Sequence, residues 1–124
     1  ALHATTGMVL LVEDEDDLRA GVRDMLMGLG HSVIEATSAD EATALLADLP
    51  DIAMVLSDIQ LIGEATGLDL AERVNRKLPF ILMTSLPKDH EMFLKAQTLA
   101  PVLQKPFTAA DLAALITPNE VAAE

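Results

Sequence analysis

The sequence predicts an α/β fold of the type (βα)5, a doubly wound five-stranded parallel sheet with helices on both faces. Short apolar runs alternate five times with amphipathic stretches of helical period, which is typical of strand–helix units that build a parallel sheet. Three of the runs are apolar throughout, as strands covered on both faces are. The length of 124 residues suits one domain. The predicted strands are 8–12, 32–35, 52–57, 80–84 and 101–104.

The first predicted strand runs into five consecutive acids, residues 13–17, and then into the first helix. Apolar residues recur along that helix at i, i+4, i+7, i+8 and i+11, and Gly30 stands where a C-terminal glycine ends a helix. Glu15, Asp16 and Asp17 suit the positive N-terminal end of the helix dipole. The residues predicted to face inward are Leu18, Val22, Met25, Leu26 and Leu29.

The second and third helices have recognisable ends. Ser38 and Glu41 form a capping-box pattern that opens the second helix, and Pro50 ends it. The third helix ends before Pro79. The inward-facing residues are predicted to be Ala42, Leu45, Leu46 and Leu49 in the second helix and Leu68, Ala71 and Val74 in the third.

Two further helices complete the pattern, and Thr108 is the predicted N-cap of the last one. Together the elements predict one domain over residues 8–117, with tails at 1–7 and 118–124. The chain is either a single-domain protein or a domain taken from a longer protein, and the first residue Ala1 and the short tails favour the second. The inward-facing residues are predicted to be Met92, Phe93, Ala96 and Leu99 in the fourth helix and Leu112, Leu115 and Ile116 in the fifth.

Composition limits the partners of the chain. Eight basic and twenty acidic residues give a net charge of −12, so the chain should repel nucleic acid and anionic membranes and bind proteins or cations. No stretch has the roughly 18 apolar residues of a transmembrane helix. The sequence contains no cysteine, which excludes disulfides and thiolate chemistry and fits the reducing cytoplasm. We therefore expect a cytoplasmic location.

Polar residues follow the predicted strands at the edge where parallel α/β sheets place their sites. Glu13 and Asp14 follow the first strand, Asp58 the third, Thr84 ends the fourth and Lys105 follows the fifth. Three nearby carboxylates raise one another's pKa unless a cation neutralises them. Oxygen ligands without histidine or cysteine suit a hard ion such as Mg²⁺.

In order and spacing, this set resembles the receiver domain of two-component response regulators, a flavodoxin-like fold. Asp58 lies 44 residues after Asp14, Thr84 lies 26 after Asp58, and the Lys105-Pro106-Phe107 motif begins 21 after Thr84. Each motif is weak alone, but the ordered set covers nearly the whole chain. The resemblance implies a signalling phosphoacceptor domain that catalyses its own phosphorylation and dephosphorylation, and not a separate enzyme.

The resemblance also implies a role for each site residue. Asp58 would accept a phosphoryl group from a phosphohistidine of a histidine kinase or phosphotransfer protein. Asp14, Asp58 and the backbone carbonyl of Gln60 would bind Mg²⁺, with Glu13 acting through water. Lys105 would pair with the carboxylate and later with the phosphoryl group, and Thr84 would turn its hydroxyl onto a phosphoryl oxygen. The Lys105–Pro106 bond would be cis.

Four features depart from the usual family pattern. Ile62 stands where proline is common, and the loop after Asp58 is one residue longer than usual. Similar long loops, and a pair such as Thr84-Ser85, occur in receiver domains attached to hybrid histidine kinases, which this chain resembles in these two features. Val102 replaces the usual aromatic residue three positions before Lys105, so coupling through an aromatic ring is not available. Because Leu86 cannot orient a hydrolytic water, we expect a phosphorylated form of intermediate to long lifetime.

Two other interpretations remain open. A haloacid-dehalogenase-like phosphatase would use Asp14 as its nucleophile, and Asp14-Glu15-Asp16 matches its Asp-x-Asp pattern. That class also has paired acids after the lysine, which this chain lacks, and it leaves Asp58 without a role. A pseudoreceiver that only binds proteins would not need the complete set of acids, threonine and lysine. The sequence leaves the cognate kinase, the output and the oligomeric state open.

Overall fold

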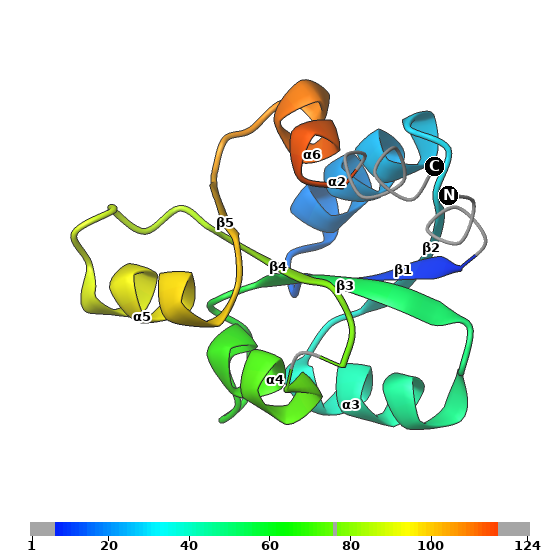
Figure 1. Cartoon of the computed structure of the whole chain (residues 1–124), viewed down its shortest axis with the longest axis horizontal. Helices are drawn as coiled ribbons and strands as arrows, with labels where there is room; N and C mark the ends of the chain where they lie inside the picture. The colour runs from blue at the N-terminus through cyan, green and yellow to red at the C-terminus, as the bar shows by residue number, and fades with distance from the viewer. Residues whose placement is uncertain (1–6, 76, 117–124) are drawn as a thin grey trace.

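The computed structural model describes residues 7–75 and 77–116 as one sheet with helices on both of its faces (Figure 1). Five strands alternate with five helices, as the apolar pattern predicts. In chain order the elements are β1 (Met8–Val12), α2 (Asp16–Gly28), β2 (Ser32–Ala36), α3 (Ala39–Asp48), β3 (Ile52–Asp58), α4 (Gly67–Val74), β4 (Phe80–Thr84), α5 (Glu91–Leu99), β5 (Val102–Gln104) and α6 (Ala109–Ile116).

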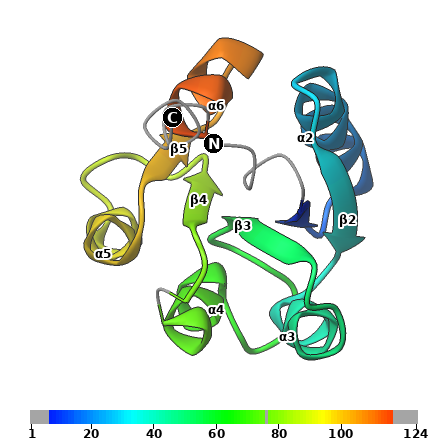
Figure 2. The ribbon, with the colours of Figure 1, turned by 45° about the vertical axis from the view of Figure 1, so that its right-hand side comes forward.

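All strand pairs are parallel, in the order β2-β1-β3-β4-β5. This is the flavodoxin-like order, in which the chain reverses its direction of winding after β2 and leaves a crevice between the ends of β1 and β3. Figure 2 shows β2 and β5 at opposite edges of the sheet, with β3 and β4 between them. The prediction of a doubly wound (βα)5 fold is therefore confirmed.

The sheet carries a separate apolar core on each face. On one face, residues of β1, β3 and β4 pack against α2 and α6, and Leu11, Leu26 and Leu112 have no exposed surface. On the other, Leu10, Val55 and Leu82 pack with residues of α3, α4 and α5. Figure 1 shows α2 and α6 above the sheet and the other three helices below it. Burial on both faces explains why the central strands are apolar throughout.

The predicted inner face of α2 is wrong at its two ends. Val22 and Leu26 are buried, but Leu18 is 43% exposed and Leu29 is 38% exposed. Leu18 lies in the first turn, where it lines an open groove with Lys105 and Pro106 instead of entering the core. Leu29 lies past the last helical residue, so helical periodicity no longer determines where its side chain points.

The capping box predicted for the second helix is only half formed. Ser38 Oγ accepts a hydrogen bond from the backbone N–H of Glu41 at 3.1 Å. The Glu41 carboxylate instead accepts from the backbone N–H of Thr37 at 2.6 Å. A complete capping box forms at α4, between Thr66 and Asp69. Helix α4 therefore begins at a defined residue just after the loop that follows β3.

Other boundaries agree closely with the sequence. Thr108 caps α6 by accepting from the backbone N–H of Asp111 at 3.1 Å. Strands β2 and β3 each extend one residue beyond their predicted ends, to Ala36 and Asp58. Leu115 is 36% exposed, so it does not join the buried face of α6 as predicted. Except for Gly7, the predicted tails 1–7 and 118–124 lie outside the described residues. Among those residues, the structure has no helix long and apolar enough to span a membrane.

Candidate functional site

The parallel register brings the predicted site residues to one edge of the sheet. Val12, the last residue of β1, pairs with Ser57 of β3, so Glu13, which follows β1, and Asp58, the last residue of β3, lie at the carboxyl ends of neighbouring strands. Asp58 pairs with Met83, one residue before Thr84. Because the register of each strand is set by its buried face, a slip of one residue would turn every side chain to the wrong side.

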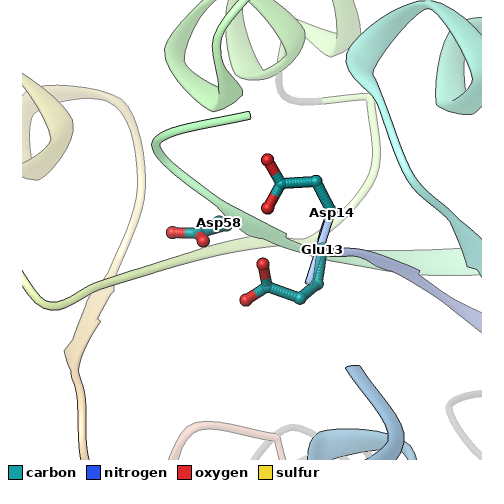
Figure 3. A group of neighbouring side chains, drawn as sticks. All are labelled: Glu13, Asp14 and Asp58. Atoms are coloured by element: carbon teal, nitrogen blue, oxygen red, sulfur yellow. The ribbon is translucent and has the colours of Figure 1, made fainter. Parts of the chain in front are cut away.

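Three carboxylates converge at this edge. Glu13, Asp14 and Asp58 each offer an oxygen, and these oxygens all lie within 4.8 Å of one another. In Figure 3 the three carboxyl groups point into one space beyond the strand ends. Glu13 is 1% exposed and Asp58 is 8% exposed, whereas Asp14 is half-buried. The convergence predicted for the acids is therefore observed.

Lys105 supplies the positive charge of the site. Its Nζ donates to Glu13 Oε1 at 2.7 Å and to Asp58 Oδ2 at 3.1 Å. The side chain of Lys105 is only 15% exposed, so the ammonium is largely removed from solvent. Pairing with Asp58 agrees with the prediction, but the shorter contact to Glu13 was not anticipated. The Lys105–Pro106 bond is cis, which confirms that prediction.

The Lys105 ammonium lies closer to Glu13 than to Asp58, and the pKa values of these two acids are shifted in opposite directions. Burial raises the pKa of Asp58 to about 6; Lys105 acts against that rise and Glu13 adds to it. Burial also acts to raise the pKa of Glu13, but the hydrogen bond and charge of Lys105 outweigh it, and the Glu13 pKa is lowered. The pKa of Asp14 is raised by burial and by Glu13. Lys105 has a raised pKa because its two carboxylate partners outweigh its desolvation.

The donor set fits a hard divalent cation. The site presents only carboxylate oxygens, which Mg²⁺ prefers over nitrogen and sulfur ligands. One ammonium faces three acids, so at neutral pH the cluster keeps excess negative charge for a cation to neutralise. Gln60, the predicted carbonyl ligand, lies two residues beyond Asp58 in the exposed loop before α4.

Thr84 lies at the end of β4 with no exposed surface. Its Oγ1 accepts a hydrogen bond from the backbone N–H of Leu86 at 3.0 Å. The carbonyl of Leu86 accepts from Gln104 Nε2, also at 3.0 Å. The loop after β4 is therefore held from two sides, by Thr84 and by a side chain of β5. The sequence alone gave no reason to single out Gln104.

Arg19 and Gly67 support the site and were not predicted. An Arg19 nitrogen donates to the backbone carbonyl of Glu13 at 3.0 Å, and other guanidinium nitrogens bind Glu35 and Asp16. A Cβ on Gly67 would overlap the carbonyl oxygen of Asp58, so only glycine lets α4 approach the end of β3 this closely. The capping-box pattern beside Gly67 could have pointed to that residue from the sequence, whereas no local sequence pattern singles out Arg19.

Comparisons with known proteins agree with this geometry. A family model described as "Response regulator receiver domain" matches residues 9–117. "Response regulator SaeR" of Staphylococcus aureus (strain USA300) is 30% identical over 109 residues, which cover 84% of this chain and 46% of SaeR. The chain thus spans about half the length of the curated relatives it matches.

Solved structures support the same fold. The signal receiver domain of a modulated diguanylate cyclase from Desulfovibrio desulfuricans G20 is 32% identical, with a TM-score of 0.76, and the match covers 92% of this chain and 96% of that one. The signal receiver domain of an HD domain-containing protein from Pseudomonas fluorescens Pf-5 has a TM-score of 0.80, covering 95% and 98% of the two chains. At 22% identity the second likeness shows the fold alone.

Proposed function

Because the chain belongs to the family of response regulator receiver domains, we propose that Asp58 is its phosphoacceptor and that phosphorylation switches its interactions with other proteins. The observation that carries this proposal is the position of Asp58. It is the buried acid that shares both the ammonium of Lys105 and the acidic cluster with Glu13 and Asp14. A carboxylate held this way is a nucleophile beside the charges that a phosphoryl group needs.

In the proposed reaction an oxygen of Asp58 forms a bond to phosphorus as the phosphorus–nitrogen bond of a phosphohistidine breaks. The electron pair of that bond stays on the imidazole, and the product is an acyl phosphate. Lys105 then donates to a phosphoryl oxygen from the position it holds beside Asp58. Thr84 turns its hydroxyl towards another phosphoryl oxygen. Both contacts neutralise the negative charge that spreads over the group during transfer.

Magnesium is the proposed cofactor. Asp14, Asp58 and the backbone carbonyl of Gln60 would hold the ion, and Glu13 would act through water. When bound, it would supply positive charge to the transferring phosphoryl group. The short contact between Glu13 and Lys105 supports the indirect role of Glu13, because its Oε1 is already engaged by an ammonium.

The proposed partner is a histidine kinase or a histidine phosphotransfer protein. The net charge of −12 supports a protein partner over nucleic acid or an anionic membrane. We also propose that the chain acts in the cytoplasm and is a receiver of a larger signalling protein, with a hybrid histidine kinase as the candidate class. The loop after Asp58 and the Thr84-Ser85 pair support that class.

The test uses the whole chain with Mg²⁺ and acetyl phosphate as a small phosphodonor. Intact-mass measurement should show one added phosphoryl group on the wild type. The increment should disappear for Asp58→Asn and in the presence of a chelator. Asp58→Glu is the matched control for charge, since it keeps the carboxylate but moves it by one methylene. A phosphorylated Asp58→Asn protein would contradict the proposal and favour Asp14 as the nucleophile.

A further inference from the structure

Gln104 lies directly opposite Thr84 across the β4–β5 pair. The strands are also joined there by a hydrogen bond from the backbone N–H of Lys105 to the carbonyl of Thr84, at 2.7 Å. Parallel neighbours in register point their side chains to the same face of the sheet. Gln104 therefore shares a face with the hydroxyl proposed to bind the phosphoryl group.

The two side chains hold the same loop residue. Leu86 donates its backbone N–H to Thr84 Oγ1 and accepts a hydrogen bond from Gln104 Nε2 on its carbonyl, both at 3.0 Å. The backbone N–H and the carbonyl of Leu86 are thus both hydrogen-bonded, the first to Thr84 of β4 and the second to Gln104 of β5. Leu86 and Gln104 are half-buried, so these bonds are partly shielded from competition by water.

This arrangement opposes any movement of the Thr84 side chain. Thr84 Oγ1 cannot approach the phosphoryl group while keeping the Leu86 N–H unless the loop moves with it. The loop cannot move freely while Gln104 holds the Leu86 carbonyl. Val102, two residues before Gln104, contributes only a half-buried aliphatic side chain packed against the core. The side-chain hydrogen bond that links β5 to this loop therefore comes from Gln104.

We infer that Gln104 is a positioning residue that sets the resting orientation of the Thr84 hydroxyl through Leu86, and so limits how readily the phosphorylated state forms. The inference rests on the proposed function, because it assigns Thr84 to the phosphoryl group. Gln104 itself touches no reacting atom. Its action requires the chain of contacts Gln104–Leu86–Thr84, and removing either end should release the loop.

The first measurement is amide hydrogen exchange of Leu86 by NMR in the unphosphorylated protein. Gln104→Met keeps the length of the side chain but removes the donor. Exchange at Leu86 should become faster by about fivefold, the factor expected for one ordinary hydrogen bond. Gln104→Leu should give the same result and guards against an effect peculiar to methionine. Gln97→Met makes the same chemical change on the exposed surface of α5 and should leave Leu86 unchanged.

The second measurement separates positioning from a merely structural role. The initial rate of phosphorylation by acetyl phosphate is measured for wild type, Gln104→Met, Thr84→Val and the double variant. Gln104→Met should raise the rate by about fivefold over wild type, and this gain should vanish in the Thr84→Val background. Valine has the shape of threonine without the acceptor oxygen, so it breaks the chain of contacts with little change in volume.

Two results would overturn the inference while leaving the proposed function intact. Unchanged exchange at Leu86 in both Gln104 variants would show that the tether does not hold the loop. If Gln104→Met changed the phosphorylation rate equally in the wild-type and Thr84→Val backgrounds, Gln104 would not act through Thr84. A wild-type protein that is not phosphorylated by acetyl phosphate would contradict the proposed function itself. The wild-type measurement alone therefore distinguishes that failure from a failure of the inference about Gln104.

Discussion

The ammonium of Lys105 lies closer to Glu13, at 2.7 Å, than to Asp58, at 3.1 Å, although 92 residues separate Lys105 from Glu13 in the chain. One charge is thus shared unequally between two buried acids. Glu13 receives the larger share and has a lowered pKa, while the pKa of Asp58 is raised to about 6. Glu13 therefore competes with the proposed phosphoacceptor for its cation.

Replacing Lys105 with Met should destabilise the protein in buffer without Mg²⁺. Two buried carboxylates then lose their only observed ammonium partner within the described residues. Breaking a buried ion pair on one side costs about 3 kcal/mol, and the loss should be largest above pH 7, where both acids are ionised. Urea unfolding at pH 5 and at pH 7.5 measures it.

Lys95→Met is the control for Lys105→Met, because Lys95 is an exposed lysine on α5. It should change the free energy of unfolding by less than about 0.5 kcal/mol. Added Mg²⁺ should restore part of the stability lost by Lys105→Met, since the ion takes over the neutralising role. Equal changes in the free energy of unfolding for the two substitutions would show that the Lys105 ammonium stabilises the protein no more than an exposed lysine does.

Asp58→Asn should stabilise the folded protein in chelator at neutral pH. A carboxyl whose folded-state pKa is raised binds its proton more tightly in the folded state, so its contribution is present below the unfolded pKa of 3.8 and is lost as pH rises through about 6. Ionised Asp58 therefore costs stability at pH 7.5, by about 1–3 kcal/mol. Asparagine removes that cost.

The pH dependence supplies the check on Asp58→Asn. The stability difference between variant and wild type should be small at pH 4 and should grow towards pH 7.5. Urea unfolding at four pH values measures it. A difference that shrinks with rising pH would mean that the Asp58 pKa is lowered in the folded protein and that Lys105 dominates its environment.

Gly67→Ala should displace the end of β3 and impair phosphorylation. The new Cβ would overlap the carbonyl oxygen of Asp58 and approach the Cα of Ile59 to 3.0 Å. Forcing a side chain into such a packed position costs about 2–3 kcal/mol. Gly21→Ala is the matched control, because a Cβ on that glycine of α2 meets nothing within 4 Å. It should stabilise the helix by about 0.5–1 kcal/mol.

The Gly67→Ala measurement pairs urea unfolding with the rate of phosphorylation by acetyl phosphate. Gly67→Ala should lower both stability and rate, whereas Gly21→Ala should raise stability and leave the rate unchanged. A Gly67→Ala protein with wild-type rate would show that the backbone of Asp58 tolerates the contact without moving its side chain.

Arg19→Lys should weaken Mg²⁺ binding. Arg19 ties the carbonyl of Glu13 to Glu35 on β2 and to Asp16 on α2, and the compact ammonium of a lysine cannot span these three acceptors as the planar guanidinium does. Loss of a group that orients metal-site residues typically costs about tenfold in affinity. Magnesium titration followed by NMR measures it, with Arg23→Lys as the control, since the ion pairs that Arg23 makes among the described residues, with Asp24 and Glu35, are both 3.5 Å long. Equal affinities for both variants would remove Arg19 from the site.

The fold and the main site residues were predictable because they depend on strong local patterns. Apolar runs and helical periodicity define the alternation, and parallel strands place their ends at one edge, so Glu13, Asp14, Asp58, Thr84 and Lys105 follow from the sequence. Residues with long-range polar contacts were not predictable. Gln104 binds a carbonyl 18 residues away, and no periodicity marks such a bond.

The errors have equally specific causes. Leu18 fits the helical stripe but lies where α2 extends beyond the core towards the site, so its side chain meets a groove. Glu41 fits a capping box, but Thr37 offers its carboxylate a competing pair of donors, the backbone N–H and the hydroxyl. For Leu18 the tertiary surroundings decide the contact, whereas for Glu41 a competing neighbour four residues earlier in the chain does.

The most direct test of the central claim is to locate the phosphoryl group. The wild-type chain is phosphorylated with acetyl phosphate and Mg²⁺, reduced with borohydride, which converts an aspartyl phosphate to homoserine, and mapped by peptide mass spectrometry. If Asp58 is the phosphoacceptor, homoserine should appear at position 58, and only when both phosphodonor and Mg²⁺ are present. Homoserine at position 14, or none at any position, would contradict it.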